Sequence, residues 1–555
     1  MTLRLAALAA TTGLALLAGC QRAPAPDAAD TPAATVASTP ADAVRGRVAA
    51  HWFGRQWPKN FLPGFRREHV ADDFAQLKAD GFDTVVLLVA WGDFQPVFSP
   101  CCTYDERAFE RLRFLLDQAD AAGLKVMLRL GYGWSFHPDA GDVGDRQQRV
   151  LNDPAAREAF LAFLARISKE TAGRDGLVLS FLSWEDLWLR RVDDSAAGTW
   201  AEFLATHPAG EPRPAALPDP VADAKLFHAY WDWLLVEEFV APAAPLFPAL
   251  SLEARVDSDP RFETGPDGAP VVAEWISHDG MLRLPAGQPL TLYWAPYWGA
   301  LNQGEQLPAT RSLELLDAML AQVAEKSDAP VFIDQFNVVD NTPGHEHNAV
   351  IRPEETAAFL HASVCTMKRR GVLGYGYWTT RDYAESPLHN PAFGYGLEGW
   401  TLRRAQGEPA QALEALPSGD FQLAFAAGDH LAQLIPPRRG RLPRADDARP
   451  DQACVEAEVR TPGVLEVSAG GKRVPLRFDA TGLQRRCAGL APQPGAEGLA
   501  FDVHARSGEF ALRDLSLFDH VQYGGLYDLD GRPAALLEPV QRMNRDFRGD
   551  AARCD

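Results

Sequence analysis

The sequence lacks the features of a metal centre or a polytopic membrane protein. Only 7 of its 555 residues are cysteine, and no two of them have the Cys-x-x-Cys spacing of common zinc sites. After residue 20 there is no run of about 18 apolar residues, the length that a membrane-spanning helix needs. No internal repeat is visible. We therefore predict no metal, no cofactor and no transmembrane helix in the body of the chain.

Positive charge is also scarce. The chain has 54 lysine and arginine residues against 74 aspartate and glutamate residues, which gives a net charge of −20. Such a chain is not expected to bind nucleic acid or an anionic membrane surface, since both repel an acidic protein. The balance fits a soluble enzyme outside the cytoplasm, although it does not identify a substrate.

The N-terminus combines a basic residue, an apolar stretch and a cysteine. Arg4 precedes an apolar run that ends in Leu17-Ala-Gly-Cys20, which resembles the cleavage box of bacterial lipoproteins. The resemblance implies a signal peptide over residues 1–19 and a lipid on Cys20. It also implies the outer membrane as the location, on its periplasmic or surface face, because Gln21 rather than aspartate follows the cysteine. Attachment to the membrane would be by the lipid anchor only.

Residues 20–45 are rich in proline, alanine, threonine and aspartate. A segment of this composition buries too little apolar surface to offset its loss of conformational entropy. We predict a lipidated, disordered tether there.

From residue 46 the hydrophobic pattern alternates between strands and helices. The expected strands are 48–53, 84–90, 124–130, 176–182, 249–255, 290–295, 331–336 and 372–379. The expected helices are 71–80, 105–122, 153–170, 221–240, 313–326 and 354–370. Eight strands separated by helices predict an α/β fold of the (β/α)8 TIM-barrel type over residues 46–388.

The pattern changes after the barrel to short alternating strands, which predict an antiparallel β-sandwich over residues 389–522. Its opening, Asn390-Pro-Ala-Phe-Gly-Tyr-Gly-Leu-Glu-Gly-Trp400, resembles the start of jelly-roll carbohydrate-binding modules. The resemblance implies a sugar-binding domain, and a purely structural appendage is the alternative. Residues 523–555 are expected to pack back on the rest of the chain as a tail that contains a helix.

The cysteines beyond Cys20 are expected to pair in an oxidising compartment. Cys454 and Cys487 lie in the same predicted β region, so they are our first choice for a disulfide. For the adjacent Cys101 and Cys102 three states remain open: a bond to each other, bonds elsewhere, or free thiols.

Aromatic and charged residues follow the predicted strands, and the carboxyl ends of parallel barrel strands meet at one face. Sugar rings stack on aromatic side chains and need fixed polar partners for their hydroxyls, so this composition predicts a carbohydrate site. For any single tryptophan, packing in the core is the alternative. The expected substrate-binding residues are Arg129, Trp134, Trp184, Glu253, Tyr293, Trp294, Trp298, Asn337, Trp378 and Asp382.

Glu185 is the strongest candidate for catalysis. It ends the apolar run of the fourth predicted strand and follows Trp184. An apolar environment raises the pKa of a carboxyl, as a general acid near neutral pH requires. The alternative is an ion pair with Arg190 or Arg191.

The barrel as a whole resembles the clan A glycoside hydrolases, the group that includes the family 5 cellulases. The resemblance implies a general acid/base at the end of strand four, where Glu185 stands, and a nucleophilic glutamate at the end of strand seven. It also implies that Arg129 supports the catalytic carboxylates. Trp184 replaces the asparagine that usually precedes the acid.

The second catalytic position departs further from the family, because Ile333-Asp-Gln-Phe-Asn337 has Gln335 where the nucleophile is expected. An amide does not attack the anomeric carbon, so double displacement between carboxyls about 5–5.5 Å apart does not carry over intact.

Three explanations for Gln335 remain open. A local shift of the strand would let Asp334 serve, although strand alternation points it away from Gln335. Glu253, Asp257 or Asp382 would be the base of an inverting reaction. Alternatively, a 2-acetamido group of the substrate is the nucleophile, and Asp334 and Gln335 orient it.

Our main hypothesis is a glycoside hydrolase that cleaves an envelope or extracellular polysaccharide or oligosaccharide, with Glu185 as general acid and Asp334 and Gln335 at the second catalytic position. The alternative is a catalytically inactive carbohydrate-binding lipoprotein in which Gln335 has replaced the nucleophile. Few cations follow the strands, so neutral glycans are favoured.

Overall fold

The computed structural model describes residues 39–55, 61–98, 102–132, 153–182, 197–206, 217–219, 223–254, 256, 258–266, 268, 270–296, 304–339, 348–384, 386–435, 452–490, 498–518 and 521–549. Residues 39–555 belong to one compact unit. The predictions for Cys20, Trp134, Trp184, Glu185 and Trp298 therefore concern positions outside the described residues. In the part of the chain that is described, no helix is both long and apolar enough to cross a membrane.

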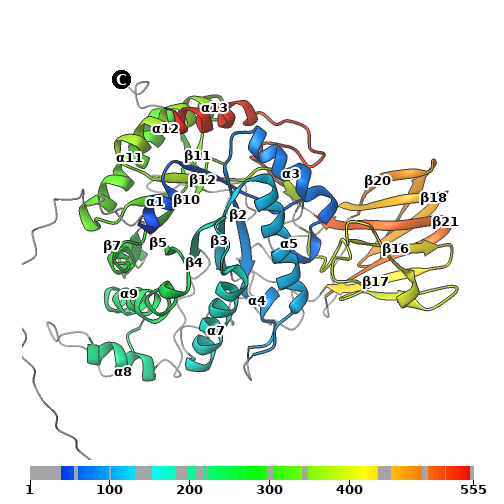
Figure 1. Cartoon of the computed structure of the whole chain (residues 1–555), viewed down its shortest axis with the longest axis horizontal. Coiled ribbons are helices and arrows are strands. Elements are labelled where there is room, and N and C mark those ends of the chain that lie inside the picture. The colour runs from blue at the N-terminus through cyan, green and yellow to red at the C-terminus, as the bar shows by residue number, and fades with distance from the viewer. Residues whose placement is uncertain are drawn as a thin grey trace, which may run out of the picture. The chain divides into compact units, whose positions relative to one another are not determined.

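Eight parallel strands close into a barrel, in the order β1-β12-β10-β8-β5-β4-β3-β2, so the predicted TIM-barrel fold is confirmed (Figure 1). Each strand is short and almost wholly buried, as expected for a parallel sheet covered on both faces. The strands are β1 (Arg47–His51), β2 (Thr84–Ala90), β3 (Lys125–Tyr132), β4 (Leu177–Leu182), β5 (Leu250–Ala254), β8 (Leu290–Trp294), β10 (Val331–Asn337) and β12 (Gly374–Trp378).

The helices that follow the strands cover the outside of the barrel (Figure 1). They present apolar faces to the strands, for example Phe109, Leu112 and Leu116 of α5. The main helices are α3 (Arg67–Ala79), α5 (Glu106–Ala122), α7 (Pro154–Thr171), α9 (Ala224–Trp233), α11 (Ala309–Lys326) and α12 (Thr356–Arg369). Shorter helices are α2 (Phe61–Gly64), α4 (Trp91–Phe94), α8 (Ala197–Thr206) and α10 (Ala241–Ala243), and α9 continues into a π-helix, η4 (Leu234–Val240).

A short helix precedes the first barrel strand, within the range 20–45 that the sequence predicted as a tether. Residues Pro40–Val44 form helix α1, with a capping box between Thr39 and Asp42. Ala41 and Val44 are buried in a cluster with strand residues of the barrel interior, including Ala49. Helix α1 therefore packs against the barrel through these two side chains.

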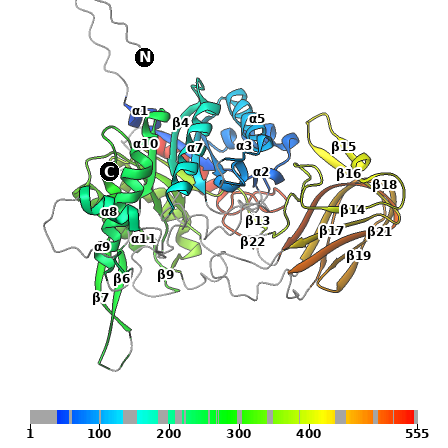
Figure 2. The ribbon, with the colours of Figure 1, turned by 90° about the horizontal axis from the view of Figure 1, so that it is seen from below.

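Between β5 and β8 the chain inserts an antiparallel hairpin, β6 (Ser258–Thr264) with β7 (Pro270–Ser277), which projects from the barrel (Figure 2). The two-stranded sheet β9 (Gln306–Leu307) with β11 (Val350–Ile351) lies between barrel elements in sequence. The sequence pattern did not predict either insertion.

The C-terminal domain is an antiparallel β-domain, as predicted, and its strands form one sheet curled around its own core. Its long strands β18 (Gln452–Ala469) and β21 (Leu499–Phe518) pair along most of their length, and the ladder shifts register near Gly463. A Cβ on Gly463 would lie 2.1 Å from the carbonyl oxygen of Ser507, so only glycine fits at this bend. The other strands are β14 (Thr401–Arg403), β15 (Leu413–Ala415), β16 (Phe421–Ala426), β17 (His430–Ile435), β19 (Lys472–Phe478) and β20 (Gly482–Gly489).

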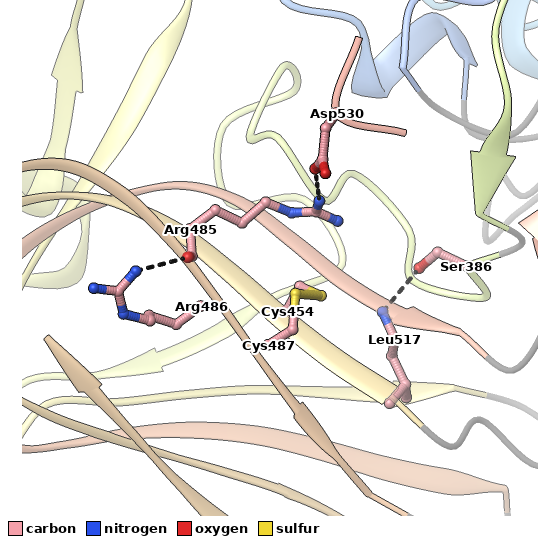
Figure 3. The surroundings of a disulfide bond; sticks show 7 residues. All are labelled: Ser386, Cys454, Arg485, Arg486, Cys487, Leu517 and Asp530. Carbon is pink, nitrogen blue, oxygen red and sulfur yellow. Dashed lines mark hydrogen bonds and ion pairs between the residues drawn. A yellow bond between two sulfur atoms is a disulfide. The ribbon is translucent and has the colours of Figure 1, made fainter. Parts of the chain in front are cut away.

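A disulfide joins Cys454 of β18 to Cys487 of β20, as the sequence indicated (Figure 3). The two residues face each other across the ladder, with Cα atoms 4.1 Å apart. Near it, Arg485 makes an ion pair of 3.5 Å with Asp530 of the tail. Cys102 is also disulfide-bonded, which excludes the free-thiol alternative for that residue, and so is Cys365.

The barrel and the curled sheet meet at the start of α3. The carboxylate of Asp420, from the sheet domain, accepts hydrogen bonds from the backbone N–H groups of Arg67 and Glu68 at 3.0 and 3.1 Å. Buried Arg66 donates to the carbonyl oxygens of Phe421 and Arg513. Asp420 thus caps a barrel helix from the neighbouring domain.

The C-terminal tail returns to the barrel. Strand β22 (Val521–Gln522) pairs with β13 (Tyr383–Ala384), and helix α13 (Leu537–Arg548) contacts α12. The Tyr375 hydroxyl of β12 donates to Asn544 Oδ1 of α13 at 2.5 Å.

Candidate active site

A buried arginine lies at the centre of the polar cluster at the strand ends. Arg129 of β3 is fully buried, and its Nη2 lies 3.2 Å from both carboxylate oxygens of Glu253 on β5. Its Nη1 donates to the amide oxygen of Gln335 on β10 at 2.5 Å. Three residues that the sequence proposed separately are therefore joined in one network.

Strand β10 contains a bulge at Asp334. Its pairing with β8 runs Ile333 to Leu292 and then Gln335 to Tyr293, so Asp334 is an extra residue without a partner in the ladder. A bulge places two consecutive residues opposite one and interrupts the alternation of faces. The bulge explains how two consecutive residues, Asp334 and Gln335, both approach Arg129 and Glu253. In a regular strand, alternation would turn one of the two away.

The carboxyl group of Asp334 is fully buried. Burial and the nearby charge of Glu253 raise the pKa of Asp334 well above its ordinary value, while Arg129 opposes them. Neither of its carboxyl oxygens has a hydrogen-bond partner among the described residues. A proton on Asp334 resolves this, because the protonated group donates to Glu253. We therefore take Asp334 as protonated beside the ion pair between Arg129 and Glu253.

His51, which the sequence analysis did not single out, is part of the same site. Its Nε2 lies 2.8 Å from the backbone carbonyl oxygen of Asp334. Burial and the charge of Arg129 lower the pKa of His51 to about 3, so the ring is neutral. The sequence signal was a polar residue at the end of an apolar strand, the same signal that pointed to Glu185 and Glu253.

Among the described aromatic residues, Trp378 lies near this cluster. The ring of Trp378, at the end of β12, is 5.1 Å from the ring of His51 and 4.8 Å from that of Phe53. Its side chain is partly exposed, and the peptide bond to Thr379 is cis. This position suits a residue that contacts a bound ring.

Trp294 is a correction. Its ring is fully buried against the rings of Phe336 on β10 and Phe359 on α12, at centroid distances of 5.1 Å from each. It therefore fills the layer between the barrel and its helices and does not reach the open face. A tryptophan at a strand end can either contact a ligand or pack in the core, and only the packing of α12 decides between these two roles.

Asp382 is also placed differently from the expectation. Its Oδ1 accepts a hydrogen bond of 2.9 Å from the backbone N–H of Gly525 in the tail, and its own N–H donates to the Tyr527 carbonyl. Burial raises the pKa of Asp382 to about 6. It fixes the tail to the barrel, so we no longer consider it as the second catalytic carboxylate.

The remaining described candidates are buried near the ends of β8 and β10. Tyr293 is 5% exposed and pairs with Gln335 in the ladder. Asn337 is 6% exposed, and its Oδ1 accepts from the Val339 N–H, so its side chain supports the turn after β10.

The described residues contain no group of three or more histidine, cysteine, aspartate or glutamate side chains placed to hold a metal ion.

No family model matches the chain, and no curated protein matches it. Solved structures with similar folds include the exo-β-1,4-mannosidase Op5Man5 from Opitutaceae bacterium strain TAV5, with 18% identity and a TM-score of 0.39 over 62% of this chain and 53% of that one. An endo-1,4-β-mannanase from Rhizomucor miehei has 12% identity and a TM-score of 0.39 over 60% of this chain and 86% of that one.

The endoglucanase Cel5A from Thermotoga maritima has 16% identity and a TM-score of 0.37 over 62% of this chain and 92% of that one. The match to the Opitutaceae mannosidase spans about half the length of that protein. These neighbours are glycoside hydrolases by name, but likeness at this level carries no argument about the substrate or the catalytic residues of this chain.

Proposed function

We propose that the protein is a glycoside hydrolase that cleaves a neutral polysaccharide of the cell envelope or its surroundings. The observation that carries the proposal is the buried Glu253–Asp334 pair beside Arg129, at the end of the barrel where TIM-barrel enzymes have their active sites. Burial of two neighbouring carboxyl groups is costly to folding, so a functional reason is expected.

The pair supports an inverting reaction. Glu185 protonates the glycosidic oxygen as the bond from that oxygen to the anomeric carbon breaks. A water molecule forms the new bond to the anomeric carbon and gives its proton to Glu253. Asp334 is protonated and donates a hydrogen bond to Glu253, which stabilises the negative charge of that base. Gln335 takes no proton, since its amide is held by Arg129.

We also propose that the enzyme is held at the outer membrane by a lipid on Cys20, with the proline-rich segment after this residue as the tether. The aromatic residues after the strands, Trp378 among them, would hold successive sugar rings. The scarcity of cations among the strand-end residues favours a neutral glycan.

One observation favours a second function, that of an inactive carbohydrate-binding lipoprotein. Gln335 is well fixed by Arg129 at the position where the resembled family has its nucleophile. A site that had lost catalysis but retained its shape would look like this.

The test uses the chain without residues 1–20 and a panel of neutral, acetamido-substituted and acidic polysaccharides, with release of new reducing ends as the readout. We expect release from a neutral glycan, and a loss of at least about 100-fold in kcat for Glu185→Gln and for Glu253→Gln. Glu354→Gln, at an exposed position, is the matched control and is expected to retain full activity. NMR of the first product should show an inverted anomeric configuration.

Release of reducing ends that persists in Glu253→Gln would refute its role as base. No release from any glycan, with binding retained in both the parent chain and Glu185→Gln, would favour the binding lipoprotein instead.

A further inference from the structure

We propose that His51 is a positioning residue for the carboxylate pair: its imidazole holds the carbonyl of the Asp334 bulge and so keeps Asp334 beside Glu253. The consequence for catalysis rests on the proposed function, whereas the consequence for geometry does not.

The backbone carbonyl group at the bulge has a side-chain partner from a distant strand. His51 Nε2 lies 2.8 Å from the carbonyl oxygen of Asp334, although β1 and β10 are not neighbours in the barrel and β12 lies between them. A carbonyl oxygen only accepts, so Nε2 must carry the proton and donate. A buried histidine thus supplies a hydrogen bond to the residue that breaks the strand pattern.

Gly376 of β12 makes this contact possible. A Cβ at position 376 would lie 2.3 Å from the Asp334 carbonyl oxygen and 3.5 Å from His51 Nε2. Any other residue would therefore push the bulge outward. Its strand reads Gly374-Tyr-Gly376-Tyr-Trp378, and glycine in the interior of a strand marks the close approach of another group.

The protonation state of His51 does not change over the range where an enzyme of this kind works. Its second nitrogen, Nδ1, is buried and has no partner among the described residues, as expected for the unprotonated nitrogen of a neutral ring. Arg129 disfavours a second positive charge nearby. His51 is therefore a fixed hydrogen-bond donor and not an acid or base in the reaction.

This donor determines where the side chain of Asp334 points. If the Asp334 carbonyl loses the hydrogen bond from His51, the free energy falls when the peptide rotates back into regular pairing with β8, because a buried unpaired carbonyl is costly. Regular alternation would turn either Asp334 or Gln335 away from Arg129. The carboxylate pair would then come apart without any change in its own residues.

The first pair of variants separates the donor from the ring. His51→Gln keeps an N–H donor near the position of Nε2, whereas His51→Leu keeps the bulk and removes the donor, and both lose the ring contact with Trp378. We expect kcat to fall 10- to 100-fold in His51→Leu with KM changed less than about threefold, and to stay within about threefold of wild type in His51→Gln. The pH–rate profile should shift in His51→Leu only.

Crystal structures of both variants give a readout without activity. We expect the register shift between Ile333 and Gln335 to be lost in His51→Leu and retained in His51→Gln. Gly376→Ala is expected to displace the bulge with His51 intact, and Gly549→Ala, where the nearest atom to the new Cβ is 3.4 Å away, serves as its control.

The outcomes are distinguishable. An unchanged bulge in the His51→Leu structure, or equal loss of activity in both His51 variants, would overturn the positioning role. If the parent chain releases no sugar from any glycan, the proposed hydrolase fails, while the crystal structures still decide whether His51 holds the bulge.

Discussion

Replacement of Arg129 by methionine tests the electrostatic core of the site. The variant keeps most of the apolar stem but removes the donors to both oxygens of Glu253 and to Gln335. Breaking a buried ion pair by removing one partner costs about 3–5 kcal/mol, because the remaining charge is left in an apolar environment. For a barrel of about 340 residues, with an unfolding entropy near 0.7 kcal/mol/K, this corresponds to a fall in Tm of about 4–7 °C.

The loss of stability in Arg129→Met should depend on pH. In the wild type the charge of Arg129 opposes the rise in the pKa of Asp334. Without Arg129 the pKa of Asp334 rises further, so the folded variant binds more protons than the unfolded chain above about pH 4. Stability is then present at low pH and lost as pH rises, and we expect the deficit in Tm to be larger at pH 7.5 than at pH 4.5. Differential scanning calorimetry of wild type and variant at both pH values measures it.

Two further variants control the experiment. Arg174→Met removes an arginine from ion pairs with Asp117 and Asp120 at the surface, at 2.8 and 3.2 Å, and should cost no more than about 1 kcal/mol. The double variant Arg129→Met with Glu253→Gln removes the stranded charge and should recover part of the loss. Equal effects of Arg129→Met and Arg174→Met at pH 7.5 would refute the reasoning.

Three other predictions concern stability. The raised pKa of Asp334 keeps its carboxyl group protonated in the folded protein, so stability should fall as pH rises above about 4. Asp334→Asn should flatten this dependence of Tm on pH, and parallel curves of Tm against pH for wild type and variant would contradict the protonation of Asp334. Asp420→Ala should lower the free energy of unfolding by about 1–2 kcal/mol, because it removes the cap of α3. Denaturant unfolding measures this loss against the exposed control Asp479→Ala, and equal losses in the two variants would show that the cap is not significant. Loss of the Cys454–Cys487 bridge, which closes 33 residues, should destabilise the curled sheet by up to about 4 kcal/mol, and unchanged melting of the double alanine variant would argue against it.

The sequence predicted those features that depend on local pattern. Eight apolar strands alternate with amphipathic helices, and that order has few solutions other than a closed parallel barrel. Polar residues at strand ends meet at one face for the same reason, so Arg129, Glu253 and Gln335 were found before their contacts were known. Cys454 and Cys487 were paired from their shared β region.

Tertiary structure alone decided which of these residues act together. The bulge at Asp334 depends on a histidine two strands away and on the absence of a side chain at Gly376, and no count along β10 reveals either. Trp294 became a core residue because α12 presents Phe359 to it, and the tail engaged Asp382 from more than a hundred residues away. Hydrophobic periodicity is a property of neighbours in sequence, whereas burial, pairing and protonation depend on contacts between distant segments, and these exist only after the barrel has closed.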